Sequence, residues 1–135
     1  MHHTLSIPTR GPGLTEITRD VAALLPLADG LLTLFIRHTS ASIQENANPE
    51  VRADLVAYME RLVPPSTDPT MAYLTHTYEG PDDMPAHIKA GLLPTSLHIP
   101  VQRGQMRLGT WQGLYLVEHR TRPQTREVAP HLAPD

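Results

Sequence analysis

The chain has 135 residues, of which 40% are hydrophobic and 19% are charged, and its net charge is -3 when the histidines are neutral. These values predict one globular domain over residues 1–135. No run of about 18 apolar residues is present and the arginines are dispersed, so the composition argues against a membrane protein and against a nucleic-acid binder. The absence of cysteine excludes disulfides and thiolate chemistry and fits a cytoplasmic protein.

The first third of the chain predicts a strand, a helix and a second strand. Alternation over residues 4–7 indicates a short strand whose pairing is limited by Pro8. Residues 15–25 carry apolar side chains at helical spacing and are followed by Pro26. The segment Leu31–Ile36 is almost wholly apolar, so we expect a strand that is buried on both faces.

The middle of the chain predicts a longer helix, a linker and a short helix. Asn48-Pro49-Glu50 is a strong helix start, with a capping amide, a proline and an acid in the first turn. We expect this helix to end at residue 62, to bury one apolar face and to be followed by a proline-rich loop. A short helix follows near residue 83, with Asp82 or Asp83 as its expected N-cap.

The last third of the chain predicts consecutive strands. Residues 96–101 alternate between apolar and polar, and segments near 106–108, 114–119 and 125–129 read as further strands joined by turns. We therefore predict an α+β fold with a mixed or mostly antiparallel sheet, two main helices and one short helix.

One stretch of the chain, from Tyr73 to Lys89, concentrates ionisable groups around a Gly-Pro turn. It holds His76, Asp83, His87 and Lys89, the only lysine. Two imidazoles on rigid elements can bind a divalent metal, which needs three or four ligands in a protein site. The spacing of the two histidines is not a diagnostic metal motif, and local hydrogen bonding remains the alternative for each.

Two further groups of polar residues are candidates. His38 and Ser40 follow the predicted strand that ends at Ile36, and Glu45 and Asn46 lie just beyond them. The hydroxyl groups suit phosphate oxygens and Glu45 suits a general base, although these residues also suit a plain strand–helix connection. The second group is Thr110-Trp111-Gln112 between two glycines, where the tryptophan either stacks on a flat ring or packs in the core.

Several of these motifs resemble one family. The blocks are His38–Ser42, Glu45-Asn46, Tyr78–Lys89, Leu108–Gly113 and Glu118–Arg120, and the resemblance extends from about Leu5 to Val128. They resemble the YjbQ family, also called secondary thiamine-phosphate synthase, although many relatives have Asn where this chain has Asp83.

The resemblance implies a homotrimer and an activity on small molecules. The activity joins an aminopyrimidine methyl diphosphate to a thiazole phosphate and releases pyrophosphate. Carried over to this chain, the implied catalytic residues are Glu45, His38, Asp83 and Lys89. The implied substrate-binding residues are Ser40, Asn46, Thr110, Trp111 and Gln112. A divalent metal, zinc or magnesium, is implied at His38, His76 and His87.

Two other functions remain open at this point. One is a metal-dependent hydrolase of a phosphorylated or carboxylated metabolite, with the same three histidines as ligands and Glu45 as the base acting on bound water. The other is a non-catalytic small-molecule binding protein whose pocket lies between subunits.

Overall fold

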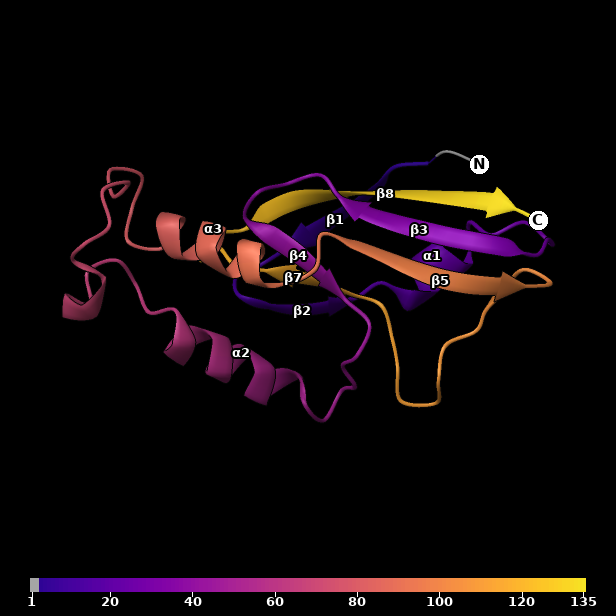
Figure 1. The fold of residues 1–135 in the computed structure, drawn as a ribbon, viewed down its shortest axis with the longest axis horizontal. Coiled ribbons are helices and arrows are strands. Elements are labelled where there is room, and N and C mark those ends of the chain that lie inside the picture. The colour runs from indigo at the N-terminus through magenta and orange to yellow at the C-terminus, as the bar shows by residue number, and fades with distance from the viewer. Residues whose placement is uncertain (1–2) are drawn as a thin grey trace.

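The computed structural model describes residues 3–135 and contains two antiparallel sheets. The larger sheet has the strand order β1-β8-β3-β5-β6 (Figure 1). Its strands are β1 (Leu5–Thr9), β8 (Gln124–Pro134), β3 (Gly30–Ile36), β5 (Ser96–Gln102) and β6 (Gln105–Met106). The smaller sheet has the order β2-β7-β4, formed by β2 (Gly13–Glu16), β7 (Tyr115–Glu118) and β4 (Ala41–Gln44).

Both sheets contribute to one hydrophobic core. Alternate residues of the larger sheet, such as Leu32, Leu34 and Ile99, point inward and are buried, as the two-residue period of a strand requires. Ile43 and Leu116 of the smaller sheet belong to the same cluster. The core therefore fixes the smaller sheet, and the loops at its ends, relative to the larger sheet.

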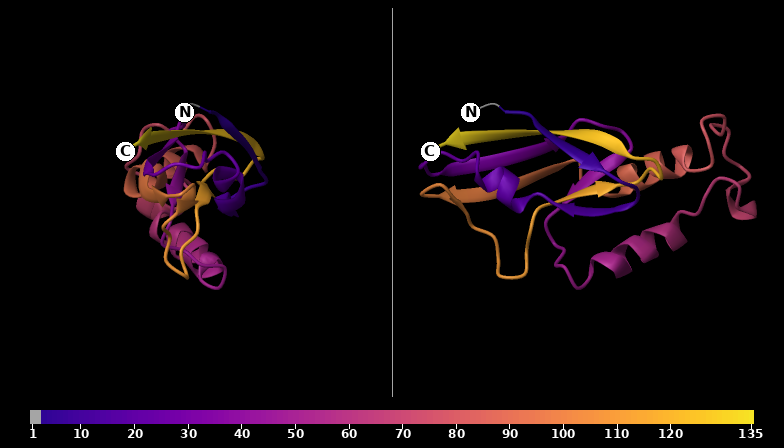
Figure 2. Two further views of the ribbon diagram at one scale, coloured as in Figure 1. Left: turned by 90° about the vertical axis from the view of Figure 1, so that its right-hand side faces the viewer. Right: turned by 180° about the vertical axis from the view of Figure 1, so that it is seen from behind.

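Three helices complete the fold: α1 (Thr18–Ala22), α2 (Arg52–Leu62) and α3 (Asp83–Leu92). Helix α2 and the 3₁₀ turn Pro69–Met71 project beyond one end of the sheets, whereas β8 ends at the opposite end (Figure 2). The predicted α+β class, antiparallel pairing and number of helices are confirmed. None of the helices among residues 3–135 has the length and apolar character that a membrane span requires.

The predicted helix over residues 15–25 is largely wrong. Residues 13–16 form β2, which pairs with β7, and the backbone N–H of Ile17 donates to the carbonyl of Leu114 over 2.8 Å. Helix α1 then has only five residues. Pairing with a buried strand satisfies the backbone groups of this segment, and the helical spacing of its apolar residues could not reveal that.

The prediction that the strand at 31–36 is buried on both faces is also wrong. In β3, Leu31 is 44% exposed and Phe35 is 49% exposed, because no element of residues 3–135 covers the outer face of the larger sheet. Likewise, none of the residues of α2 is buried. The apolar content of these segments correctly predicted that they form a strand and a helix. It overestimated how much of their surface is buried by the rest of the chain.

Neither aspartate at the start of α3 caps the helix. The side chain of Asp82 makes no capping bond, and its Oδ2 accepts hydrogen bonds from the backbone N–H and the hydroxyl of Thr121. The backbone hydrogen bond from Thr121 lowers the pKa of Asp82. Asp83 turns toward two histidines, so the acids of this turn serve tertiary contacts.

Candidate functional site

His76, Asp83 and His87 form one compact group. The loop before α3 positions His76, and the first turns of α3 position Asp83 and His87 on one helix face, four residues apart. Each residue offers one ligand atom, and these atoms lie within 4.8 Å of one another. Nε2 of His76 is 2.9 Å from Oδ2 of Asp83, and Nε2 of His87 is 3.4 Å from Oδ1.

The hydrogen bonds around this group suit a divalent cation. Nδ1 of His87 is 3.0 Å from the carbonyl oxygen of Thr39, to which it donates, so Nε2 is the ring nitrogen that faces Asp83. Oδ1 of Asp83 is buried and faces both Nε2 of His87 and Nη1 of Arg120. Two imidazoles and one carboxylate at this spacing suit a divalent cation, and a backbone carbonyl behind a histidine is a common outer contact of metal ligands.

Arg120 attaches this group to the rest of the protein. Its Nη1 is 2.6 Å from Oδ1 of Asp83, and its Nε donates to Oγ of Ser40. Burial raises the pKa of Asp83, but the hydrogen bond and charge of Arg120, together with His76 and His87, outweigh burial and lower it. Asp83 is therefore ionised at neutral pH, as a metal ligand must be.

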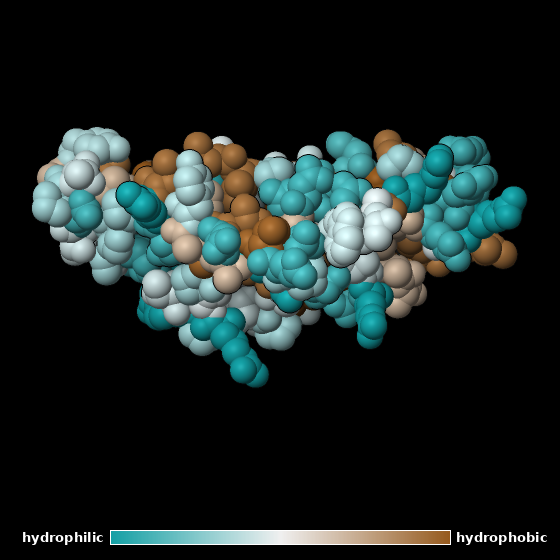
Figure 3. All heavy atoms as spheres, turned by 90° about the horizontal axis from the view of Figure 1, so that it is seen from below, coloured by the Kyte–Doolittle hydropathy of each residue, from teal (hydrophilic) through white to brown (hydrophobic). Residues whose placement is uncertain are grey.

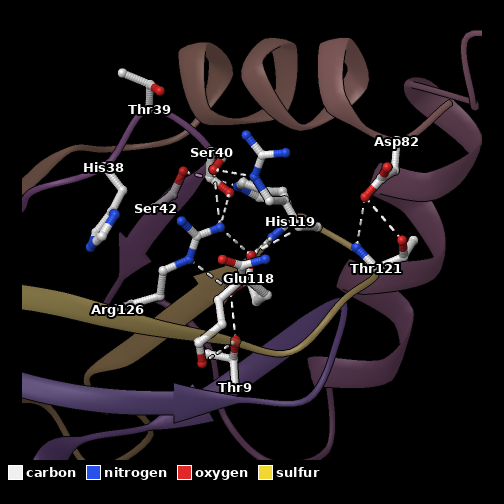
Figure 4. A network of polar contacts seen from close by, with 12 residues as sticks. Thr9, His38, Thr39, Ser40, Ser42, Asp82, Glu118, His119, Thr121 and Arg126 are labelled. Atoms are coloured by element: carbon white, nitrogen blue, oxygen red, sulfur yellow. Dashed lines mark hydrogen bonds and ion pairs between the residues drawn. The ribbon is translucent and has the colours of Figure 1, made fainter. Parts of the chain in front are cut away.

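Behind Arg120 lies a buried polar network centred on Glu118. Arg126 donates from Nε and Nη2 to the two carboxylate oxygens of Glu118, and Nη2 also donates to Oγ and the carbonyl of Ser40 (Figure 4). Thr9 donates its hydroxyl proton to Glu118 over 2.6 Å. Burial raises the pKa of Glu118, but the bonds from Arg126 and Thr9 outweigh burial and lower it. The network thus holds Ser40 from two sides.

His119 lies beside this network and is buried. Its Nε2 is 3.0 Å from Oγ of Ser42. Burial and the nearby charges of Lys89 and Arg126 lower the pKa of His119 to about 4, despite the opposing charge of Glu118. It is therefore neutral at physiological pH and acts as a hydrogen-bonding residue inside the fold.

The structure places His38 apart from the group of His76, Asp83 and His87. Its Nε2 accepts the backbone N–H of Glu127 over 2.8 Å. Burial, followed by the charge of Arg126, lowers the pKa of His38. In Figure 4 the His38 ring lies beside the Glu118 network and is not part of it. The carboxylate of Asp83 takes the third position that the resemblance assigns to His38.

The other predicted substrate-binding residues lie at the opposite end of β4. Ser40 precedes this strand and Glu45 and Asn46 follow it, a separation of roughly 16 Å along an extended chain. Oδ1 of Asn46 accepts from Nε2 of Gln112, whose Oε1 accepts the N–H of Gly109.

The Gln112 amide thus holds its own loop in place. Thr110 is exposed and Trp111 is 75% exposed, so the core-tryptophan alternative is wrong. Oε2 of Glu45 is buried without a hydrogen-bond partner. In Figure 1 this loop lies far along the molecule from the first turn of α3.

Lys89 faces a different part of the molecule. It is 4% exposed, and its Nζ donates to Oε1 of Glu60 on α2 over 2.6 Å. It is two residues beyond His87 and so lies on another face of α3. It lines an apolar cavity under α2 together with Leu55 and His119.

The residues that sequence reasoning missed are arginines and their acid. Arg120, Arg126 and Glu118 were not among the predicted site residues. A signal existed for two of them, because Glu118 directly follows the apolar run that ends at Val117 and Arg120 lies two residues further on, much as His38 follows β3. Arg126 is an inward-pointing arginine within β8, and only tertiary structure gives it a partner.

The chain belongs to the YjbQ family. Residues 3–135 match the family described as "UPF0047 protein YjbQ-like". A UPF0047 protein of Synechocystis sp. is 46% identical over 134 residues, which cover 96% of this chain and 88% of the relative. The YjbQ protein of Salmonella typhimurium is 45% identical over 133 residues, covering 96% and 93%.

Solved structures confirm the fold. A conserved hypothetical protein from Thermus thermophilus has a TM-score of 0.81 and 34% identity, over 97% of this chain and 99% of that chain. A YjbQ/UPF0047 family protein from Clostridium acetobutylicum has a TM-score of 0.80 and 29% identity, over 98% and 99%. These names state a family and no activity.

The histidine group generates a prediction about metal binding. Replacing His87 by Gln should weaken Zn²⁺ binding at least tenfold, because an amide is a poorer zinc ligand than imidazole. Isothermal titration calorimetry on metal-stripped protein measures this. His3→Gln is the matched control, since His3 is exposed and lies outside the group. Equal affinity of wild type and His87→Gln would remove the metal site.

His119 generates a prediction about stability. Its folded pKa of about 4 lies below the ordinary 6.5, so the unfolded chain takes up a proton first and stability falls as the pH drops from 6.5 to 4. The slope reaches at most about 1.4 kcal/mol per pH unit. Urea unfolding from pH 7 to 5 should show a flatter slope for His119→Gln than for wild type or for the exposed control His3→Gln. An unchanged slope in His119→Gln contradicts the neutral, buried state.

Proposed function

We propose that the protein is a metal-assisted enzyme of the thiamine-phosphate synthase type. The observation that carries the proposal is the position of Asp83, which closes a metal-binding group with His76 and His87 and is also paired with Arg120. A cation and a guanidinium held by one carboxylate suit an anionic leaving group such as diphosphate.

In the proposed reaction, the bond between the pyrimidine methylene carbon and the diphosphate oxygen breaks. Pyrophosphate leaves with the electron pair, and the thiazole nitrogen forms the new carbon–nitrogen bond. A divalent cation would supply Lewis-acid charge to the leaving group, and His76, Asp83 and His87 would hold it. Arg120 would donate hydrogen bonds to the phosphate oxygens from a direction fixed by Ser40 and Asp83.

A second candidate is a hydrolase that uses the same group. Oε2 of Glu79 is 2.9 Å from Nε2 of His76, and Glu79 is exposed enough to reach a water molecule. Glu79 is therefore a better placed base than Glu45, which lies beyond the other end of β4. Hydrolysis of the pyrimidine diphosphate without a thiazole acceptor would distinguish this reaction from the transfer.

The transfer predicts a specific product. Purified protein with both substrates and Mg²⁺ or Zn²⁺ should form thiamine phosphate above background, and chelation should abolish this. The double variant His76→Ala/His87→Ala should lose at least about a hundredfold, because loss of metal charge stabilisation costs several kcal/mol. His3→Gln should retain activity, because His3 is exposed and lies outside the histidine group and the sheet face. If the wild-type protein forms no product with Mg²⁺ and none with Zn²⁺, the transferase proposal is wrong.

We also propose that the protein assembles as a homotrimer through the outer face of the larger sheet. Three rows cross β5, β3 and β8 on that face, centred on Leu31, Thr33 and Phe35. The rows contain no Asp, Glu, Lys or Arg; they are Pro100-Leu31-Ala133, His98-Thr33-His131 and Ser96-Phe35-Ala129. An uncharged face with exposed large apolar residues suits a second copy.

Other apolar residues are also exposed on the molecule. Figure 3 shows hydrophobic residues near the middle of the underside, surrounded by hydrophilic ones. Exposed apolar side chains elsewhere in the chain include Tyr58 of α2 and Trp111. Assembly would allow a neighbouring copy to bring Trp111 to a histidine group, which its own chain does not do.

Assembly is tested with two leucines. Leu31→Glu should dissociate the trimer, because it places a charge in the proposed interface. Leu27→Glu is the matched control, since Leu27 is 89% exposed outside the sheet face. Analytical ultracentrifugation should give three times the chain mass for wild type and Leu27→Glu. A monomeric wild type, or a trimeric Leu31→Glu, contradicts the proposed interface.

A further inference from the structure

An open cleft next to the histidine group is lined by four of the ten arginines of the chain. Its volume is about 830 Å³, within the roughly 300–1,000 Å³ of small-molecule sites. No Asp or Glu lines it; the lining residues are Phe35, Ile36, Arg37, His38, Thr39, Ser40, Arg120, Arg122, Gln124 and Arg126. We propose that this cleft is an oxyanion site that binds the phosphoryl group of a small-molecule ligand.

The balance of charge supports this assignment. Three of the arginines have carboxylate partners that do not line the cleft: Arg126 pairs with Glu118, Arg120 with Asp83 and Arg37 with Glu127. Arg122 is exposed and pairs with no acid among residues 3–135. The cleft therefore keeps an excess positive charge, although the whole chain is negative. A mobile anion is the natural partner for that excess.

The donors of the cleft are also held in place before any ligand arrives. Arg120 uses Nε and Nη1 in protein contacts and keeps Nη2, while Arg126 uses Nε and Nη2 and keeps Nη1. Both guanidinium groups are fixed on Ser40. Rigid guanidinium donors lose little entropy on binding and match the geometry of phosphate oxygens.

His38 adds a neutral donor to the cleft. Because its Nε2 accepts the N–H of Glu127, the proton of the neutral ring is on Nδ1. This nitrogen can therefore donate to an anion without carrying charge. The hydroxyl of Thr39 is a further donor in the lining. The strand-end residues thus serve anion binding rather than metal binding.

The oxyanion site would hold the diphosphate of the substrate in the proposed function, and it rests on that function only in part. Arg120 connects the cleft with Asp83, so a diphosphate in the cleft would lie beside the metal-binding group. Anion binding itself needs neither a metal nor turnover. The two proposals can therefore fail separately.

The experiment uses the full chain in EDTA with inorganic phosphate and pyrophosphate as probes. Calorimetry should detect binding that weakens as NaCl is raised, because the cleft is open to screening. The variant Arg37→Gln/Arg122→Gln should bind at least roughly tenfold more weakly, since it removes two charged donors. Arg37 and its partner Glu127 are both about half exposed, so loss of that pair should not unfold the protein.

The matched control is Arg19→Gln/Arg61→Gln, which removes the same charge from exposed positions on α1 and α2. It should bind both probes like wild type. No binding to metal-free wild type, or equal weakening in the two double variants, overturns the oxyanion site. Phosphate binding without synthase turnover would support the cleft and count against the transferase.

Discussion

The buried carboxylate of Glu118 is the contact on which the rest of the site depends. It accepts hydrogen bonds from Thr9 on β1, from Arg126 on β8 and from the backbone N–H groups of His119 and Arg120. A buried charge is costly unless it is fully paired, and removing one partner of such a pair costs about 3–5 kcal/mol. Glu118 therefore fixes both sheets and two arginines at once.

A continuous chain of contacts connects this network with the histidine group. Arg126 and Arg120 meet on Ser40, and Arg120 continues to Asp83, which faces His76 and His87. The group of His76, Asp83 and His87 and the arginine cleft are thus two sides of one connected unit. Each polar residue in it is held by hydrogen bonds or ion pairs to its neighbours, and such contacts keep side chains in fixed positions.

The two ends of β4 divide the predicted site residues into two sets. His38 and Ser40 belong with the arginines, whereas Glu45, Asn46 and the Trp111 loop lie at the far end of a four-residue strand. One chain does not bring both sets to a single substrate. In the proposed trimer, chains associate through the uncharged outer face of the larger sheet. A neighbouring copy would then bring its exposed Trp111 loop to the histidine group, and so supply the second set of residues.

The sequence by itself determined the family, the α+β class, most strands and the pairing of His76 with His87. These features follow from local signals in the sequence: alternation of apolar and polar residues, residues typical of helix starts, and contiguous sequence motifs. Only the tertiary structure decided that residues 13–16 pair as a strand, that Asp83 and not His38 joins the two histidines, and that Arg120, Arg122 and Arg126 meet in one cleft. Such groupings join residues up to 105 positions apart, as between Gly13 and Glu118. The burial and pairing of charges across strands produce no periodic pattern in the sequence. The three-dimensional structure is therefore needed to identify them.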